Sequence, residues 1–365
     1  MKVLVVGTGG SIVSGISTAA DQMATILPRL GHSADRLNAG ERMRTKSNAL
    51  NLENVRAVLF DAVAVAHRTR RQSADVVWIH TFGVPALPAL RALAIVLGAR
   101  LGGAPAVVQF HAFGLEQMLD GCGWSLRFAL RAVTALSGAS VVLHEGAASA
   151  LRRVVGRSPI HVLANWVDVP EKLKPLPPRP PLRLVFVGGL VRRKGVRQLI
   201  DAMKLLEDTP AELRLVGGPG EDGPVALEQL QVAARALVAS GRVTFTGEQD
   251  TDGVRSELEA GHLLVLPSEA EGMPMAMLEA MAVGRPVLVT NAGNMKSVVE
   301  ETGCGWVMPD GKPETIANYL RSINGASGAI EAASSSAGRA AADRYSARAR
   351  KDDIEAILTS VLTAS

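Results

Sequence analysis

Cysteine and aromatic residues are scarce in this chain of 365 residues. The two cysteines, Cys122 and Cys304, are too few for a disulfide framework, and neither lies in the Cys/His spacing of a metal site. Such cysteine usage is typical of a reducing compartment, and we expect a cytoplasmic protein. Aromatic residues make up only 4% of the chain. This argues against a nucleic-acid surface, because bases stack on aromatic side chains.

Long uncharged apolar runs are also absent. A membrane-spanning helix needs about 20 consecutive apolar residues, and the longest uncharged candidate, residues 3–20, is interrupted by glycines and serines. The apolar block at residues 3–6 is too short for a signal peptide and is typical of a buried strand. We therefore expect neither a membrane span nor a leader. With 47% hydrophobic residues, the chain should form about two globular domains.

Charge is unevenly divided along the chain. Residues 1–170 hold 17 Lys and Arg against 10 Asp and Glu, whereas the remainder holds 22 against 25. The basic half indicates an anionic partner, such as phosphates, nucleic acid or a membrane surface, unless it is simply a solvated face. Its basic clusters have few aromatic neighbours, which favours an anionic membrane over nucleic acid. These clusters contain Arg42, Arg44, Lys46, Arg68, Arg70 and Arg71.

Residues 125–136 have the spacing of an amphipathic helix. Arg127 and Arg131 lie four positions apart, beside apolar residues that include Phe128 and Leu130. A helix of this kind either lies on a membrane surface or packs against the core while its arginines reach into solvent. The sequence leaves both interpretations open.

Short apolar runs alternate with segments of helical length along the whole chain. This alternation is typical of a parallel sheet with helices on both faces, so the fold class is α/β. In the first half, strands are expected at residues 1–6, 75–80, 106–111, 140–143 and 160–164, with a helix at 16–30. In the second half, strands are expected at residues 182–187, 212–216, 243–246, 263–266 and 286–289.

Six prolines lie between residues 170 and 181. Proline at this density disfavours a helix interior or a central strand, so this proline-rich segment (residues 170–181) is predicted to be a stiff connector. It would join Rossmann-like domains at residues 1–169 and 182–338, with ligands bound in a cleft where the strand ends face each other. Residues 325–338 should form a loose helix or loop. Residues 339–365 should form one helix that crosses back to the first domain.

The most informative segment follows the fourth strand expected in the second half. Its loop carries Glu269 and Glu271, Gly272 lets the backbone approach a ligand, and Pro274 suits the first turn of a helix. Free N–H groups at that helix start would attract phosphates. Glu279 lies more than one turn further on and could bind a sugar diol such as ribose. Taken alone, two such glutamates are more often a helix cap and a solvated side chain.

The full stretch of residues 267–286 resembles the Glu-x7-Glu signature of the retaining glycosyltransferases of family 4, which have the two-domain GT-B fold. The matching pattern is Pro-Ser, then Glu-Gly-x-Pro, then Leu-Glu-Ala-Met-Ala-x-Gly-x-Pro-Val. The resemblance implies that Glu271 contacts the transferred sugar and that Glu279 holds the donor ribose. Other residues around the helix start would complete the nucleotide-sugar site: Gly272, Met273, Pro274, Met275 and Leu278.

The segment at residues 186–195 resembles the loop that opens the second domain of this family. The resemblance implies that Lys194 neutralises the departing diphosphate, a role that suits a compact ammonium group. The family has an arginine where this chain has Gly189. Either Arg192 or Arg193 replaces it, or both are solvated; Arg193 is our predicted binding residue.

Motifs elsewhere agree with the family in the same order along the chain. His111, at the end of an expected strand, resembles the family histidine that faces the donor sugar. Gly15 falls where the family has a glycine turn near the phosphates, and Gly247 occupies a glycine turn close to the nucleobase. His32 is expected to be structural.

Two competing signals are weaker. Gly7-Thr8-Gly9-Gly10-Ser11-Ile12 begins like a dinucleotide fingerprint but has Ile12 in place of the third glycine, which argues against a dehydrogenase. Asp250-Thr251-Asp252 has the form of a metal-binding Asp-x-Asp. Because it is separated from the preceding strand, we expect a surface loop there and no metal.

Together these motifs predict a retaining, metal-independent glycosyltransferase with no cofactor besides its co-substrate, a UDP or GDP type sugar. Glu271, His111 and Lys194 would form the catalytic group. The sequence around Gly272 resembles that of enzymes of bacterial surface-polysaccharide assembly. This resemblance implies a glycan or lipid-linked acceptor. The enzyme would be free in the cytoplasm or attached peripherally to the inner face of the plasma membrane. The alternatives are a sugar-nucleotide epimerase on the same fold and a catalytically weak partner subunit that binds nucleotide sugar.

Overall fold

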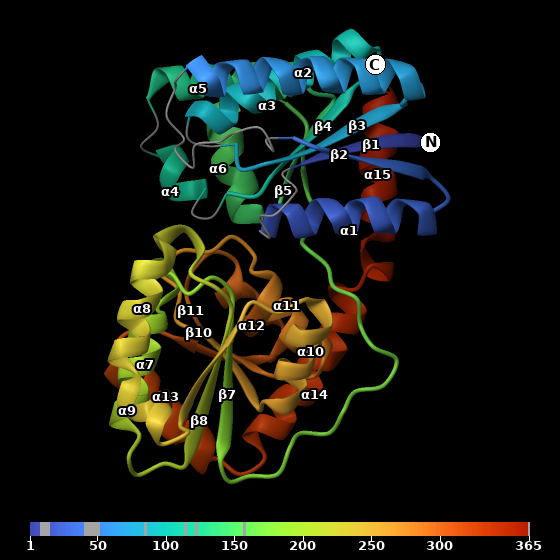
Figure 1. Ribbon diagram of the computed structural model, residues 1–365. Helices are drawn as coiled ribbons and strands as arrows, with labels where there is room; N and C mark the ends of the chain where they lie inside the picture. Colours follow the sequence, from blue (N-terminus) through green and yellow to red (C-terminus); the bar gives the residue numbers. More distant parts are fainter. Residues whose placement is uncertain are drawn as a thin grey trace. The chain divides into compact units, whose positions relative to one another are not determined.

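A computed structural model describes residues 1–7, 15–39, 52–83, 86–112, 115–120, 123–155 and 158–363 (Figure 1). The chain divides into two compact units. Unit 1 comprises Met1–Asn165 with Arg350–Ser365, and unit 2 comprises Trp166–Ala349. Each unit contains a six-stranded parallel sheet with helices packed against it, which confirms the α/β class and the two parallel-sheet domains. Within the described residues, no helix is both long enough and apolar enough to cross a bilayer.

The sheet of unit 1 has the strand order β2-β1-β3-β4-β5-β6. The strands are β1 (Lys2–Gly7), β2 (Ser33–Asn38), β3 (Val76–Thr81), β4 (Ala106–Phe110), β5 (Ala139–Val142) and β6 (Ile160–Val162). All but β2 lie close to their predicted positions. The sequence analysis missed β2 because it is an edge strand with only β1 beside it, and its mixed polar sequence lacks the apolar run of a central strand.

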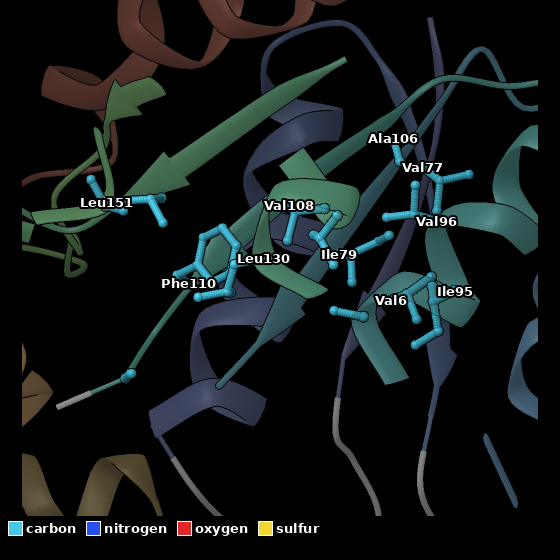
Figure 2. Packing of buried hydrophobic residues seen from close by; sticks show 14 of the residues in the cluster. Val6, Val77, Ile79, Ile95, Val96, Ala106, Val108, Phe110, Leu130 and Leu151 are labelled. Atoms are coloured by element: carbon cyan, nitrogen blue, oxygen red, sulfur yellow. The ribbon is translucent and has the colours of Figure 1, made fainter. Parts of the chain in front are cut away.

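Seven helices of unit 1 are described: α1 (Gly15–Arg29), α2 (Leu52–Gln72), α3 (Ala86–Gly102), α4 (Leu115–Asp120), α5 (Trp124–Leu136), α6 (Glu145–Val155) and α15 (Lys351–Thr363). Figure 1 shows α2, α3 and α5 along one side of the sheet and α1 on the other. The buried residues of one core cluster are aliphatic apart from Phe110, as Figure 2 shows around Ile79, Val96 and Leu130. Trp78 on β3 is also fully buried. A Cβ on Gly102 would lie 2.6 Å from Cβ of Thr69, so glycine permits the close packing of α3 on α2.

The sheet of unit 2 has the order β12-β11-β10-β7-β8-β9. Its strands are β7 (Leu182–Val187), β8 (Ala211–Val216), β9 (Val243–Gly247), β10 (Leu263–Leu266), β11 (Val287–Thr290) and β12 (Gly305–Met308). Five of them were expected near these positions. The sequence analysis missed β12, which is a short edge strand that begins with a glycine.

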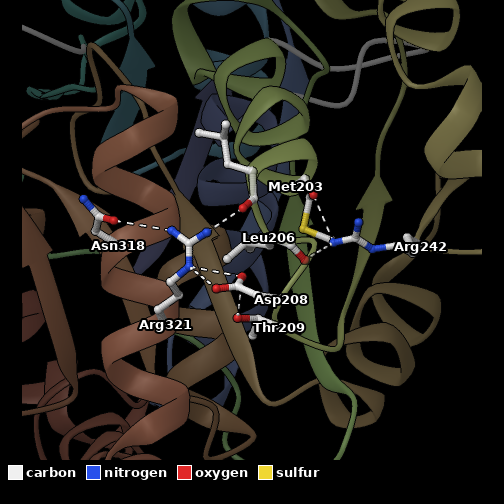
Figure 3. Close-up of polar contacts among 8 residues, drawn as sticks. Met203, Leu206, Asp208, Thr209, Arg242, Asn318 and Arg321 are labelled. Atoms are coloured by element: carbon white, nitrogen blue, oxygen red, sulfur yellow. Dashed lines mark hydrogen bonds and ion pairs between the residues drawn. The ribbon is translucent and has the colours of Figure 1, made fainter.

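The helices of unit 2 are α7 (Val196–Leu205), α8 (Gly223–Ala233), α9 (Arg235–Ala239), α10 (Thr251–Ala260), α11 (Met275–Ala282), α12 (Met295–Thr302), α13 (Pro313–Gly325) and α14 (Ala329–Arg344). Two arginines bind the carboxyl end of α7 (Figure 3). Arg321 donates to the Leu205 carbonyl at 2.5 Å, and Arg242 donates to the carbonyls of Met203 and Leu206 at 3.0 and 2.7 Å. These bonds satisfy carbonyls at the helix end, and the Met203 carbonyl also accepts a hydrogen bond from the Leu206 amide at 3.4 Å.

The prediction of one C-terminal helix over residues 339–365 is wrong, because two helices cover these residues. Of the helix or loop expected for residues 325–338, the structure has a helix from Ala329 onward. The Ala/Ser-rich residues belong to the regular helix α14, whose small side chains allow it to pack closely on α11. The helix ends at Arg344, because the next residue, Tyr345, is buried and its carbonyl accepts a hydrogen bond from the Val167 amide at 2.8 Å. A separate helix, α15, then forms part of unit 1.

The proline-rich segment is hydrogen-bonded to unit 2. The buried guanidinium of Arg285 donates to the carbonyls of Lys174 and Pro175, each at 3.1 Å. The buried ring of His262 lies 2.9 Å from the carbonyl of Pro177. The segment is thus fixed to the core of unit 2 by two buried polar side chains.

Candidate functional site

The loop between β10 and α11 carries the candidate residue Glu271. The strand is fully buried, and the chain leaves it through Pro267 and Ser268 before reaching Glu271. Pro274 has an extended conformation and directly precedes the helix, where a missing N–H costs nothing. The helix begins at Met275 and ends at Ala282, within a residue of the predicted limits. The loop is therefore fixed between two buried elements.

Glu271 is buried beside a cation. Its Oε1 accepts a hydrogen bond from the Ser268 hydroxyl at 3.1 Å and lies 3.3 Å from Nζ of Lys194. Both side chains of this ion pair are largely shielded from solvent. Because a buried carboxylate without a partner is costly, the ammonium and the hydroxyl together offset the cost of burying Glu271.

Lys194 belongs to a different loop from Glu271. It lies in a 3-10 turn between β7 and α7. Gly188, at the end of β7, makes room for its side chain. A Cβ on Gly188 would lie 2.8 Å from Nζ of Lys194, and the glycine also has a φ of 140°. The glycines near the carboxyl end of β7 therefore allow the ammonium to reach Glu271.

Arg193, and not Arg192, lies next to this pair. Its guanidinium donates to Oε1 of Glu221 at 2.7 Å and to the Ala270 carbonyl at 3.3 Å, and it lies 4.0 Å from Oε1 of Glu271. The Arg192 side chain is exposed, and only its backbone amide makes a described contact here, with Asp222. Of the two candidates for the arginine that Gly189 replaces, Arg193 has the position near the site.

Glu279 lies in the second turn of α11 and is only partly exposed. Burial raises the pKa of its carboxyl group above the ordinary value, and the nearby charge of Lys194 counteracts part of this rise. The structure therefore brings Glu271, Glu279 and Lys194 together in unit 2, as the sequence analysis expected. The ammonium group of Lys194 pairs with Glu271, and its charge also acts on Glu279.

The residues that hold the site loop were not identified from the sequence. Oγ1 of Thr290 donates to the Ser268 carbonyl at 2.5 Å. The amide of Asn294 donates to the Gly272 carbonyl at 2.9 Å, and a Cβ on Gly293 would overlap the carbonyls of Glu271 and Gly272. The glycine before Asn294 is the sequence signal that could have revealed this packing. The loop between β11 and α12 thus fixes the backbone of the site.

The other residues predicted to bind the nucleotide sugar differ in how far they are buried. Gly272, Met273 and Pro274 are buried in the site loop, and Met275 at the helix start is partly exposed. The Leu278 side chain is fully buried and packs inside unit 2. Gly247 ends β9 with a φ of 75°, and a Cβ there would meet no atom within 4 Å.

In unit 1, His111 follows β4 and pairs with a histidine that the sequence analysis did not single out. Its Nε2 lies 2.9 Å from Nδ1 of His80 at the end of β3, and the rings stack with centroids 5.1 Å apart. Burial lowers the pKa of His111 to about 4. Burial, repulsion from His111 when that ring is protonated, and the charge of Arg36 lower the pKa of His80 well below its ordinary value. Both imidazoles are therefore neutral near pH 7.

Two further predicted residues of unit 1, Gly15 and His32, lie at the start of α1 and just after its end. Gly15 is the exposed first residue of α1. The glycine-rich run before it, which begins like a dinucleotide fingerprint, lies outside the described residues from position 8 to 14. His32 lies 3.0 Å from Oε1 of Glu355 in α15 and joins two elements of unit 1, which agrees with a structural role.

The Asp-x-Asp motif begins a helix. Oδ1 of Asp250 accepts a hydrogen bond from the Gly253 amide at 2.8 Å and so caps α10, while Asp252 lies in the first helical turn. The expectation of a surface loop is wrong at this point, because an aspartate at this position satisfies a free N–H group of the helix. The described part of the chain has no group of three or more His, Cys, Asp or Glu residues placed to hold a metal ion.

Comparison with known sequences identifies a matching family over the middle of the chain. Residues 170–328 match the family described as "Glycosyl transferases group 1". TuaC of Bacillus subtilis, named for teichuronic acid biosynthesis, is 39% identical over 114 residues, which is 31% of this chain and 26% of that protein. The amylovoran biosynthesis glycosyltransferase AmsK of Erwinia amylovora is 27% identical over 150 residues, 38% of this chain and 35% of that protein. These matches span about a third or less of each relative.

Comparison with solved structures covers the whole chain. A sucrose-phosphate synthase from Thermosynechococcus elongatus has a TM-score of 0.79 at 16% identity and is covered completely, as is this chain. Anabaena Alr3699/HepE in complex with UDP has a TM-score of 0.74 at 17% identity, with 99% of this chain and 100% of that chain covered. At this identity the likeness defines the fold, which is the two-domain GT-B type shared with these glycosyltransferase structures.

Proposed function

We propose that this protein is a retaining glycosyltransferase of family 4 that transfers a sugar from a nucleotide-diphosphate donor in bacterial polysaccharide biosynthesis. The observation that carries the proposal is the grouping of Glu271, Lys194 and Glu279 at the carboxyl end of β10. It lies inside the segment that matches the group 1 glycosyl transferases. Relatives named for teichuronic acid and amylovoran biosynthesis support the polysaccharide context.

The donor is proposed to be a UDP or GDP sugar. Glu279 would accept hydrogen bonds from the ribose, and the N-terminal amides of α11 together with Lys194 and Arg193 would bind the diphosphate. The remaining predicted contacts are Gly247 near the base and Gly15 near the phosphates. One structural neighbour, Anabaena Alr3699/HepE, has solved complexes with UDP and with UDP-glucose, which favours the UDP type.

The chemistry would be displacement with retention at the anomeric carbon. The acceptor hydroxyl oxygen bonds to that carbon on the face from which the diphosphate leaves, and its proton passes to a phosphate oxygen of the leaving group. Lys194 would stabilise the negative charge that develops on the diphosphate. Glu271 would fix the sugar by its hydroxyls, and the neutral His111 would accept or donate a hydrogen bond beside the same sugar. No metal is required in this scheme, because side chains and helix amides carry the compensating charge.

Calorimetric titration tests the proposal. Wild type and Glu279→Ala would be titrated with UDP, GDP and ADP, each with and without magnesium. Binding of one nucleotide by the wild type, independent of magnesium and lost in Glu279→Ala, is expected. Glu314→Ala, which changes an exposed glutamate in the first turn of α13, is the matched control and should bind as the wild type does. Absence of binding to all three nucleotides would contradict the proposal.

The stereochemical part needs a separate measurement. With a hydroxyl acceptor, the NMR coupling constant of the product's anomeric proton distinguishes retention from inversion. Slow hydrolysis of the donor without acceptor is expected from a transferase, whereas a partner subunit that only binds nucleotide sugar should show none. An epimerase would instead convert the donor sugar while it remains attached to the nucleotide. An inverted product would contradict the retaining assignment.

The acceptor is proposed to be a hydroxyl of a glycan or a lipid-linked saccharide. A lipid-linked acceptor would bring the enzyme to the inner face of the plasma membrane as a peripheral protein. Extraction of donor-dependent product into organic solvent would identify a lipid-linked acceptor. Product that stays in the aqueous phase would identify a free glycan.

A further inference from the structure

The outward faces of two helices in unit 1 carry large apolar side chains in solvent. On α5, Trp124 is 83% exposed and Phe128 is 69% exposed. On α2, Leu59 is 60% exposed and Val63 is 67% exposed. Exposed Leu or Val residues are common singly, but aromatic and aliphatic groups at helical spacing on the same side of one domain indicate a binding surface.

The face of α5 combines these apolar groups with arginines. Trp124, Arg127, Phe128 and Arg131 follow one another at spacings of three, one and three, so they share one side of the helix, and all four are exposed. The opposite side, with Leu130 and Val133, is buried in the core. Helix α5 therefore has a face that packs in the core and a separate exposed face of aromatic and basic residues.

The face of α2 has the same composition. Arg56, Leu59, Phe60 and Val63 recur at helical spacing and are exposed, and α2 packs along α3, which in turn packs on α5. Figure 1 shows these three helices on one side of the sheet of unit 1. We call the exposed residues Arg56, Leu59, Phe60, Val63, Trp124, Arg127, Phe128 and Arg131 the outer surface.

The charge around the outer surface is strongly positive. Helices α2, α3 and α5 contain eight arginines against two acidic residues. One of these two, Asp61, is buried and paired with Arg91 at 2.6 Å, which leaves Glu53 as the exposed acidic residue of the three helices in the described chain. Apolar side chains with Trp and Phe, surrounded by arginines, have the composition of helices that lie at the interface of an anionic bilayer.

The apolar groups also have a defined position in the fold. The helices of a parallel α/β layer run back against the strands, so their first turns lie at the carboxyl edge of the sheet. Trp124 and Phe128 lie in the first turns of α5, and Leu59 lies in the second turn of α2. His80 and His111 end β3 and β4 at the same edge.

Unit 2 offers an exposed apolar helix with the opposite electrostatics. On α8, Val225 and Val232 are exposed to a similar degree as Leu59 and Val63. The described sequence of α8 contains Glu228 and no Lys or Arg, and the turn before it adds Glu221 and Asp222. Exposed valines are therefore present on both units, but those of α8 lie beside acidic residues, whereas the outer surface contains arginines.

We propose that the outer surface binds peripherally to bilayers that contain anionic lipid, with Trp124 and Phe128 inserted at the headgroup level and Arg56, Arg127 and Arg131 facing the lipid phosphates. This goes beyond the proposed catalytic function, because none of these residues belongs to the nucleotide-sugar site. The surface would hold the carboxyl edge of the unit 1 sheet beside the bilayer. A saccharide on a lipid carrier could then enter without leaving the membrane.

Vesicle flotation with the full chain tests the proposal. The probes are vesicles of phosphatidylglycerol mixed with phosphatidylcholine, and vesicles of phosphatidylcholine alone. Binding to the anionic vesicles at low salt is expected, with strong loss at high salt because surface charges are screened. Trp124→Ser combined with Phe128→Ser should reduce the bound fraction by about tenfold or more. Arg56→Gln and Arg127→Gln should each reduce it by about fivefold.

The matched control changes two exposed valines where no membrane contact is proposed. Val225→Ser combined with Val232→Ser should bind vesicles as the wild type does. Tryptophan fluorescence gives a second readout. Trp124 is the one highly exposed tryptophan among the described residues, so a blue shift on adding anionic vesicles should be absent in Trp124→Ser. Melting temperatures of all variants establish that each is folded.

Three outcomes would overturn the proposal. One is the absence of binding to anionic vesicles at low salt. Another is equal loss of binding in the control and in the Trp124 and Phe128 variant. The third is a wild-type dimer in sedimentation velocity that this variant converts to a monomer, which would assign the surface to a second copy of the chain. UDP titration of the same samples separates this proposal from the catalytic one, because the two fail independently.

Discussion

The strand ends of the two units bury polar groups in opposite ways. In unit 2, the loop after β10 buries the ion pair of Glu271 and Lys194, with atoms 3.3 Å apart. In unit 1, the ends of β3 and β4 place His80 and His111 in contact at 2.9 Å, and burial keeps both imidazoles uncharged near neutral pH. The first arrangement depends on opposite charges and the second on a single hydrogen bond.

This difference agrees with the two tasks in the proposed reaction, which are binding the charged diphosphate and binding the neutral sugar. A diphosphate carries negative charge and needs a cation fixed in advance, which Lys194 would supply. A sugar ring is neutral and needs hydrogen-bonding groups that add no charge, which the histidine pair would supply. Two parallel sheets with the same architecture thus differ mainly in the chemistry of a few residues at their carboxyl edges. The following variants test that comparison.

The largest effect is expected from Glu271→Gln. The amide retains an oxygen that accepts the Ser268 hydrogen bond, but it removes the charge beside Lys194. Turnover should fall about a hundredfold or more, while nucleotide affinity stays close to that of the wild type. Steady-state kinetics and calorimetry measure the two quantities. Glu269→Gln, at an exposed neighbouring position, is the control, and equal turnover in both variants would exclude Glu271 from the reaction.

Lys194→Met should destabilise unit 2 by about 2 kcal/mol, because it leaves the buried carboxylate of Glu271 without its cation. Adding Glu271→Gln should restore most of this loss, although activity stays low. Urea unfolding of the wild type, both single variants and the double variant gives the coupling energy. A coupling near zero would show that the two side chains do not stabilise each other.

His80→Leu should lower turnover about tenfold by removing the hydrogen bond that orients His111. His80→Asn keeps a polar atom near the position of Nδ1 and should restore much of the activity. Nitrogen NMR of the imidazoles provides a readout independent of catalysis. One His111 tautomer is expected in the wild type and a mixture of two in His80→Leu. If His111 in His80→Leu kept the single tautomer of the wild type, His80 would not position His111.

The smallest effect is a pH dependence of stability. The pKa of His111 falls from 6.5 to about 4 on folding, so the unfolded chain binds more protons between these values. Stability should therefore decrease as the pH falls from about 6.5 towards 4, with a slope of up to about 1.4 kcal/mol per pH unit for each such histidine. Urea unfolding at several pH values measures it. His80→Asn combined with His111→Asn should flatten this dependence, and an equal slope in the variant would contradict the assignment.

Much of the fold was predictable because most strands of both sheets are continuous buried apolar runs. The two missed strands differ in cause. Edge strand β2 has one neighbour and a mixed polar sequence, whereas β12 is apolar after its glycine but only four residues long, so its apolar run is short. The Ala/Ser-rich part of α14 resembles a flexible stretch, but its small residues are what its packing on α11 requires.

The residues of the candidate site could be predicted from the sequence, but the contacts between them could not. The motifs gave Glu271, Lys194 and Glu279, because the first and third lie on one short segment and all three match one family pattern. The contact between Lys194 and Glu271 joins residues 77 positions apart in the chain, and no local spacing encodes it. His80 was missed for the same reason, since its partner lies on the neighbouring strand and is 31 positions away.

The fully buried guanidinium of Arg285 has a practical consequence for separating the two units. Its hydrogen bonds reach the carbonyls of Lys174 and Pro175, so this part of the proline-rich segment belongs to the folded body of unit 2. A fragment that starts at Leu182 would lack those two acceptors, and the guanidinium would keep only its bonds to the carbonyls of Val283 and Glu259. A fragment that starts at Trp166 retains them. Limited proteolysis should therefore cut poorly within the proline-rich segment, and domain dissection should place its boundary before that segment.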